Sequence, residues 1–539
     1  MDEEPVIEEK ELLDNIEIMQ LQKHISQSLA QFDALMLPEN ACDEIYARKE
    51  TVVKDHLEMR FDFNPDIDIH HGNELTDLAQ SSDDESRSGL EKCQKPTESH
   101  SSLNTLNTNH PECTLSKLDN GVCEANDRVS DFKASVTMKD DNRYLPSASF
   151  KFDCPILALN YEEEFKTPQG NFTKGCKWSP DGSCLLVGSE DCKLRLLSLP
   201  TAVVNGEFQR ESWFMEECKT YSKAAVTIHE RELIYDYAWY PFMHSDDHRT
   251  CCFAVTCRDH PVHLWDSWTG QLICSYPSYD HLDQLVAAYS VSLNLDGSKI
   301  FCGFNKCIRV FQTNRPGRYF DKIDTKGHPG IISCMAFNPQ LPTVFAAGSY
   351  LGSLGLYNSQ NNNLFCRMEG CLGGVTHIQF SADGTKLFSG TRKNNEILCW
   401  DMRNIGKILC GYRREVSTNQ RIYFDLEPQL CRYLISGSTK GQVLKWDLEP
   451  GSEIILEDDD VPIMLPSASF NAHKDCINGI SVHPYYPVIA TSSGQRHFPE
   501  PESESDSDNN SESEVERPLF TRKKIVQENT VKLWWLGGL

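Results

Sequence analysis

The sequence predicts an all-β chain: a seven-bladed β-propeller with a disordered acidic N-terminal region and an acidic insertion in its last blade. The first observation is a pattern that recurs seven times, two apolar residues three positions apart, the second usually aromatic and often followed by Asp. The copies end at residues 197, 265, 311, 357, 400, 446 and 534. Four consecutive gaps, of 46, 46, 43 and 46 residues, are close to the period of a WD-repeat blade.

The second observation concerns turns. Asp-Gly pairs at 181–182, 296–297 and 383–384 each stand between two apolar runs, where a tight hairpin turn is needed. The expected blades therefore cover 175–199, about 233–266, 293–311, 327–357, 381–401, 433–447, and a last blade that starts near residue 472 and ends at 531–535.

The third observation predicts how the ring closes. The hexapeptide LPSASF occurs at 145–150 and again at 465–470, just before the last blade. We interpret the two copies as equivalent positions, so that a strand within about 145–160 completes the last blade. Closure of this kind removes exposed sheet edges, which otherwise promote aggregation.

The chain divides into residues 1–144 and a propeller over 145–539. The N-terminal part is rich in Ser, Asn, Asp and Glu and is expected to be mostly disordered. Within it, apolar residues at helical spacing predict a helix over 11–37, which binds a partner, packs on the domain or is only nascent. The acidic serine tracts 81–86 and 503–514 are either phosphorylation sites for acidophilic kinases or solvated linkers.

The net charge of −27 is unevenly distributed. Residues 1–145 hold 32 acidic and 14 basic residues, and the insertion at about 499–516 holds 8 acidic residues and no basic one, which leaves the remainder at −1. An RNA-binding face is therefore compatible with the acidic chain, because charge effects are screened over short distances.

Cellular context can be read from the termini and the cysteines. The start, MDEEPVIEEK, lacks the features of a signal peptide, and no apolar run is long enough to span a membrane. The 22 cysteines include no CxxC pair and no zinc-type spacing. We expect a reduced compartment, no metal, no cofactor and a monomer.

Candidate binding residues come from the turns between the second and third strands of each blade, which project from one face of a propeller. Five of the seven turns carry a basic residue, and the segment 419–421 enters the sixth blade from the same face. The candidate RNA contacts are Arg258, Lys306, Tyr350, Arg392, Lys393, Asn419, Gln420, Arg421, Lys440 and Arg496.

This set suits a single-stranded RNA loop. Cations pair with phosphates, rings and guanidinium planes stack on splayed bases, and amides pair with base edges. The alternative is that these charges only keep exposed turns soluble, and Glu190, Asp191 and Asp259 on the same rim interrupt a continuous basic ring.

Seven segments of the predicted propeller are more specific than the generic repeat: GCKWSPDGS (175–183), IYDYAWY (234–240), FCGFNK (301–306), RPGR (315–318), GIISCMAF (330–337), NQRIYFDL (419–426) and SGQRHFPEP (493–501). On these segments, the chain resembles the telomerase Cajal body protein 1 family of WD-repeat proteins over roughly residues 160–539.

The resemblance implies a non-enzymatic scaffold of the nucleus that binds small Cajal-body RNAs and their ribonucleoprotein proteins. It also implies recognition of a short loop motif, the CAB box, and retention of the particle in Cajal bodies. Telomerase RNA is an additional partner where it carries that motif.

Two other functions stay open. Trp400-Asp401-Met402-Arg403 fits the WDxR pattern of substrate adaptors for cullin-type ubiquitin ligases. A protein-only scaffold that recruits basic partners through its acidic segments is the other. An enzyme is not expected, because the sequence offers no phosphate loop, nucleophile elbow or paired-carboxylate motif.

Overall fold

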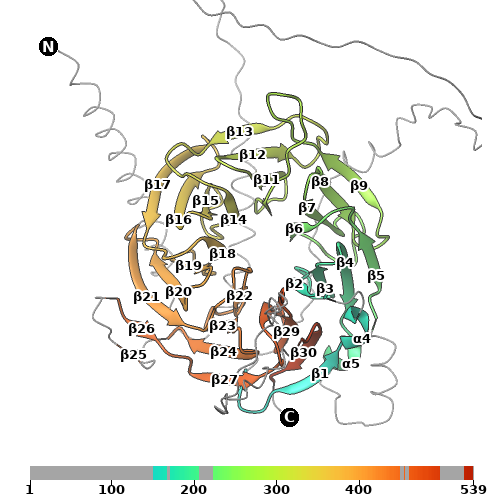
Figure 1. Ribbon diagram of the computed structural model, residues 1–539, viewed down its shortest axis with the longest axis vertical. Coiled ribbons are helices and arrows are strands. Elements are labelled where there is room, and N and C mark those ends of the chain that lie inside the picture. Colours follow the sequence, from blue (N-terminus) through green and yellow to red (C-terminus); the bar gives the residue numbers. More distant parts are fainter. Residues whose placement is uncertain are drawn as a thin grey trace, which may run out of the picture. The chain divides into compact units, whose positions relative to one another are not determined.

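The computed structural model describes residues 150–166, 170–204, 223–449, 454–455, 461–497 and 527–537. These residues form seven sheets around a common axis, with the first strand of each sheet innermost (Figure 1). The predicted seven-bladed β-propeller is therefore confirmed. The predicted helix 11–37, the boundary at 144/145, both acidic serine tracts and the insertion at 499–516 lie outside the described residues.

Each blade has four antiparallel strands, and the sheet of blade V continues into two more. From the innermost strand outward, blades I to III are β2 (Thr173–Trp178), β3 (Cys184–Ser189), β4 (Lys193–Ser198) and β5 (Val226–His229); β6 (Ile234–Trp239), β7 (Cys252–Cys257), β8 (Val262–Asp266) and β9 (Leu272–Tyr276); and β10 (Ser290–Leu293), β11 (Lys299–Gly303), β12 (Cys307–Gln312) and β13 (Asp321–Asp324).

The remaining blades follow the same order. Blades IV to VII are β14 (Ile332–Phe337), β15 (Val344–Ser349), β16 (Ser353–Asn358) and β17 (Asn363–Glu369); β18 (Val375–Phe380), β19 (Lys386–Thr391), β20 (Glu396–Asp401) and β21 (Lys407–Arg413); β22 (Phe424–Leu426), β23 (Tyr433–Gly437), β24 (Gln442–Asp447) and β27 (Ala468–Asn471); and β28 (Ile477–Val482), β29 (Val488–Ser493), β30 (Val531–Trp535) and β1 (Ile156–Asn160). Short helices α4 (Glu162–Phe165) and α5 (Thr201–Val204) lie beside blade I (Figure 1).

The recurring aromatic position and the Asp-Gly pairs explain this regularity. Trp400 and Trp446 are fully buried between blades, and burying a side chain of this size is a major source of stability. The three Asp-Gly pairs lie in the first turns of blades I, III and V, and their glycines adopt φ values of +70°, +67° and +68°. A Cβ at Gly297 would also collide with the ring of Tyr240, so the turn requires glycine.

The ring closes through β1, which pairs antiparallel with β30 and places Leu159 opposite Leu533. A strand within 145–160 was expected here and is confirmed. The equivalence of the two LPSASF copies is wrong: Phe470 belongs to β27, whereas Phe150 precedes β1 and its ring lies 5.9 Å from that of Tyr433. The pairing strand begins only at Ile156, so the repeated hexapeptide does not mark its register.

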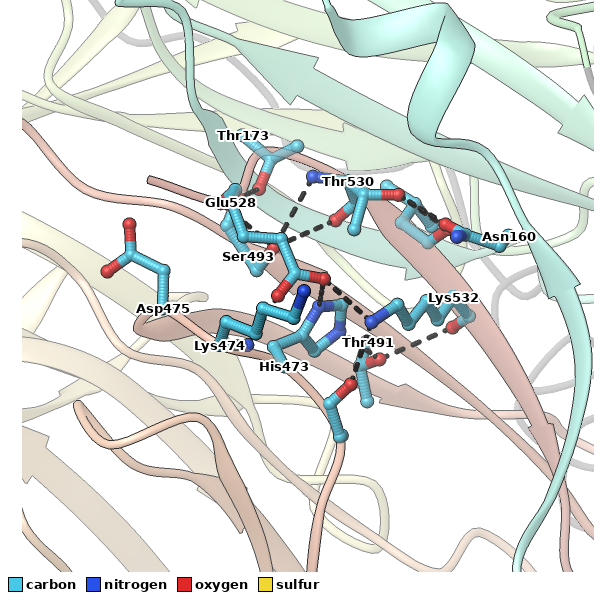
Figure 2. A network of polar contacts seen from close by, with 12 residues as sticks. Asn160, Thr173, His473, Lys474, Asp475, Thr491, Ser493, Glu528, Thr530 and Lys532 are labelled. Carbon is cyan, nitrogen blue, oxygen red and sulfur yellow. Dashed lines mark hydrogen bonds and ion pairs between the residues drawn. The ribbon is translucent and has the colours of Figure 1, made fainter. Parts of the chain in front are cut away.

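A polar network reinforces the closure (Figure 2). His473 Nε2 lies 2.7 Å from Thr491 Oγ1, while Glu528 accepts from His473 Nδ1 at 3.2 Å and from Lys532 Nζ at 2.6 Å. Thr530 Oγ1 donates to Asn160 Oδ1 at 2.7 Å. The Thr530–Asn160 bond adds a side-chain contact to the backbone pairing of β1, whereas the bonds of His473 and Glu528 hold together the other segments of the last blade.

Blade V carries a feature that the sequence analysis did not predict. The chain between β24 and β27 contributes β25 (Ile454–Ile455) and β26 (Ile463–Met464), and β26 pairs in parallel with β21. This hairpin covers the outer edge of blade V, which otherwise would present unpaired backbone groups. Among the described residues, no helix is long and apolar enough to cross a membrane.

Candidate nucleic-acid interface

One end of the ring, the loop face, carries the turns between second and third strands and the connections into the innermost strands. Backbone hydrogen bonds join these two kinds of loop: Lys306 N donates to Gly330 O at 2.8 Å, and Lys393 N donates to Thr418 O at 3.3 Å. All ten candidate residues lie in loops of this face. Their side chains, however, fall into three groups.

The first group, the paired arc, spans blades VI, VII, I and II. Arg258 pairs with Glu232 at 2.6 Å, Lys440 pairs with Glu415 at 2.7 Å, and Arg496 pairs with Glu190. Each cation therefore has a carboxylate beside it on the same face. The paired arc offers a phosphate little net attraction, so the five-blade basic rim expected from sequence is interrupted.

The second group, the open arc, spans blades III to V and the connection into blade VI. Lys306 and Lys393 are exposed and form no ion pair with any described residue. The Arg392 guanidinium lies 3.6 Å from the centre of the Tyr350 ring, and within the described residues its Nε has no hydrogen-bond partner. The open arc comprises Lys306, Tyr350, Arg392, Lys393, Asn419 and Gln420.

Asn419 and Gln420 differ in solvent exposure. Asn419 is exposed, whereas Gln420 is half-buried and its Oε1 has no hydrogen-bond partner in the described part of the chain. The two amides follow Thr418, whose carbonyl accepts from Lys393. They therefore extend the open arc with groups able to pair with base edges.

Arg421 forms the third group by itself, because it points to the axis of the ring. Its side chain is only 14% exposed, its Nη2 donates to Ser333 O at 2.8 Å, and its Nη1 pairs with Asp236 Oδ1 at 3.1 Å. Burial alone would raise the pKa of Asp236, but Lys177 and Arg421 hold this pKa below its usual value. Arg421 therefore ties blade VI to blades II and IV and is turned away from the loop face.

A second carboxyl near the axis lacks such partners. Asp425 accepts from Val482 N at 2.8 Å and from Gln379 Nε2 at 2.9 Å, but it has no ion pair with a described residue. Burial raises the pKa of Asp425 to about 6. The half-buried His377 nearby is neutral, because desolvation, with the positive charge of Lys177, lowers its pKa to about 3.

Sequence reasoning missed two aromatic residues on the loop face. The rings of Tyr235 and Tyr289 stack with centres 5.4 Å apart, at the start of β6 and just before β10. Both are half-buried, and Tyr235 lies close to Arg258 and Asp259 in the turn of blade II. An aromatic residue at the start of a predicted innermost strand, as in IYDYAWY, was the available signal.

A group that could hold a metal lies in blade II. Glu230, Cys257 and His263 place their ligand atoms within 4.8 Å of one another. Glu230 already pairs with His263 at 3.0 Å and accepts from Trp265 Nε1 at 2.7 Å, and burial raises the pKa of the Cys257 thiol. These bonds tie the third strand of blade II to the connection before β6, which gives the group a structural role.

The WDxR segment lies at the opposite end of the ring, in the turn between β20 and β21. Arg403 donates from its backbone N and its Nε to Asp401 Oδ1, at 2.9 and 3.2 Å. This pairing gives Arg403 a structural role within the turn.

The ring of seven sheets and the repeated aromatic positions define a WD-repeat protein. The family model "WD domain, G-beta repeat" matches residues 164–198 and 363–401. Telomerase Cajal body protein 1 of Bos taurus is 41% identical over 81% of this chain and 76% of its own length. The protein of the same name from Homo sapiens is 44% identical over 70% and 66%, and the homolog from Drosophila melanogaster is 34% identical over 69% and 67%. The chain belongs to the telomerase Cajal body protein 1 family.

Proposed function

We propose that this chain is a non-enzymatic scaffold that recognises the CAB-box loop of small Cajal-body RNAs and holds their ribonucleoprotein particles in the Cajal bodies of the nucleus. Telomerase RNA is a client where it carries the same motif. Membership in the family supports this role, because the names of the relatives connect them with telomerase and Cajal bodies.

The observation that carries the proposal is the open arc. Lys306 and Lys393 are available to phosphates, and the Arg392–Tyr350 pair offers a stacking surface next to them. The exposed Asn419 follows Thr418, whose carbonyl accepts from Lys393 N. A single-stranded loop needs these three kinds of group within a short span.

The test uses the full chain and an RNA hairpin that carries the CAB loop, with a scrambled-loop hairpin as its control. We expect the intact loop to bind more tightly than the scrambled loop. Because binding releases counterions, the logarithm of the binding constant should fall with the logarithm of the salt concentration, with a slope of about −0.7 per phosphate contact. Equal binding of both hairpins would contradict sequence recognition. Binding of neither hairpin would favour the protein-only scaffold.

A further inference from the structure

Two leucines on the loop face are the most exposed large apolar residues of the described chain. Leu372 is 86% exposed and Leu351 is 69% exposed. Isolated exposed leucines are ordinary, but these two share one site. Leu351 lies in the turn between β15 and β16, and Leu372 lies in the connection from β17 to β18.

Glycines allow the two segments to approach each other closely, because they have no Cβ. A Cβ at Gly352 would lie 3.0 Å from Cys371 O, and a Cβ at Gly374 would lie 2.6 Å from Tyr350 O. A Cβ at Gly373 would collide with Arg392 O. The connection that carries Leu372 therefore runs between the turn of blade IV and the turn of blade V, directly beside the Tyr350–Arg392 pair.

The charges around this site indicate which kind of ligand fits it. The turns 350–352 and 392–395 and the connection 371–374 contain two basic residues, Arg392 and Lys393, and no acidic one. A base that leaves its stack needs an apolar surface for its face, and its phosphates need cations at the sides. An RNA loop satisfies both requirements at once, whereas a protein partner would have to combine apolar and acidic groups in the same small area.

We propose that Leu351 and Leu372, together with Tyr350 and Arg392, form a base shelf that receives one unstacked base of the bound RNA loop. This inference rests on the proposed function and deepens it, since it assigns two apolar residues to base placement. The leucines supply no hydrogen bond, so the shelf holds the base by its face and leaves identification of its edge to neighbouring amides.

The experiment compares the full chain with the Leu351→Ser Leu372→Ser variant. The control is Leu430→Ser, because Leu430 is 55% exposed but lies in the turn between β22 and β23, at the opposite end of the ring. Each protein is titrated with the CAB-loop hairpin and with hairpins in which one loop nucleotide at a time is abasic. Thermal unfolding is measured in parallel and should not change, since both leucines are exposed.

We expect the double variant to bind the intact hairpin about tenfold more weakly, with an unchanged salt slope because no phosphate contact is lost. At one loop position, removal of the base should lower the affinity of the wild-type protein for the hairpin. The same abasic hairpin should bind the double variant as well as the intact hairpin does. Leu430→Ser should behave as wild type.

Other outcomes separate the two proposals. Salt-sensitive, loop-specific binding that is the same in wild type and double variant overturns the shelf and keeps the proposed function. An equal loss of affinity for intact and all abasic hairpins also overturns the shelf. Loss of a co-purifying ribonucleoprotein protein with unchanged RNA affinity would identify the leucines as a protein contact, which overturns the shelf as well. Absence of RNA binding by the wild-type chain defeats the proposed function itself.

Discussion

The paired arc and the open arc carry cations of the same kinds at equivalent turns, and they differ in what stands beside each cation. In the paired arc, Arg258, Lys440 and Arg496 each face a glutamate. In the open arc, Lys306 and Lys393 face no described carboxylate, and Arg392 lies on a tyrosine ring. The number of basic residues on a face therefore says less about nucleic-acid binding than the identity of their neighbours.

The same contrast appears near the axis with the sign reversed. Asp236 has two cationic partners and a lowered pKa, whereas Asp425 has none among the described residues and a raised pKa. Paired charges near the axis serve the fold, whereas Lys306 and Lys393 at the loop face have no ion partner among the described residues. Substitutions at the two places can separate these roles.

The largest effect is expected for Arg421→Ala, which leaves the buried Asp236 with Lys177 alone. Removing one partner of a buried pair costs about 3 kcal/mol in the free energy of unfolding, measured by chemical denaturation. Arg258→Ala, which breaks an exposed pair, should cost far less, because solvent screens that pair. If Arg421→Ala is as stable as wild type but fails to bind RNA, Arg421 belongs to the interface and the assignment to the axis is wrong.

Reversing two charges of the open arc should affect binding and spare the fold. We expect Arg392→Glu Lys393→Glu to weaken binding of the CAB-loop hairpin by about 30-fold or more at about 0.1 M salt, measured by fluorescence anisotropy, because cations that meet phosphates are replaced by repelling carboxylates. Arg403→Glu Lys407→Glu makes the same change in net charge at the opposite end of blade V. An equal loss of RNA affinity in both variants would mean that the effect comes from the net charge of the protein and not from the open arc.

Asp425, which has no ion partner among the described residues, should make the free energy of unfolding depend on pH. Because its folded pKa of about 6 exceeds its usual value of 3.8, the folded state holds this proton more tightly than the unfolded state. The group therefore destabilises the fold increasingly as pH rises from about 4 to 6. We expect Asp425→Asn to remove this dependence and to stabilise the fold at about pH 7 by about 1 kcal/mol or more.

The amide introduced by Asp425→Asn can donate to Gln379 Oε1 once the Gln379 amide turns over, because Gln379 Nε2 now donates to Asp425 and Oε1 has no hydrogen-bond partner in the described residues. Chemical denaturation between about pH 4 and pH 7, the range in which the folded and unfolded groups titrate, checks the prediction. A variant that keeps the wild-type pH slope would show that another group titrates there.

The smallest effect tests the paired arc directly. Glu415→Gln frees Lys440, so the hairpin should bind about threefold more tightly and the salt slope should steepen by roughly one phosphate contact. Glu449→Gln changes the net charge equally, but Glu449 pairs with Arg432 at the other end of the ring. An increase in affinity with both variants would indicate a general charge effect.

Sequence reasoning was strongest where a local rule decides the structure. The blade count follows from the aromatic positions, and the turn positions of the candidate residues follow from counting back from them. The ion partners could not be predicted from the sequence. Arg496 pairs with Glu190, which is 306 residues away in the chain, and the two are neighbours only because the ring closes. The direction of the Arg421 side chain and the gathering of Leu351 with Leu372 depend on packing between blades for the same reason.

The most direct measurement is ultraviolet crosslinking of the bound CAB-loop hairpin to the full chain, with each adduct located by mass spectrometry. Binding at the open arc predicts adducts at Lys306, Tyr350 and Lys393, and none at the turns that carry Arg258, Lys440 and Arg496. Adducts spread evenly over the turns of all seven blades, or confined to the opposite end of the ring, would contradict it.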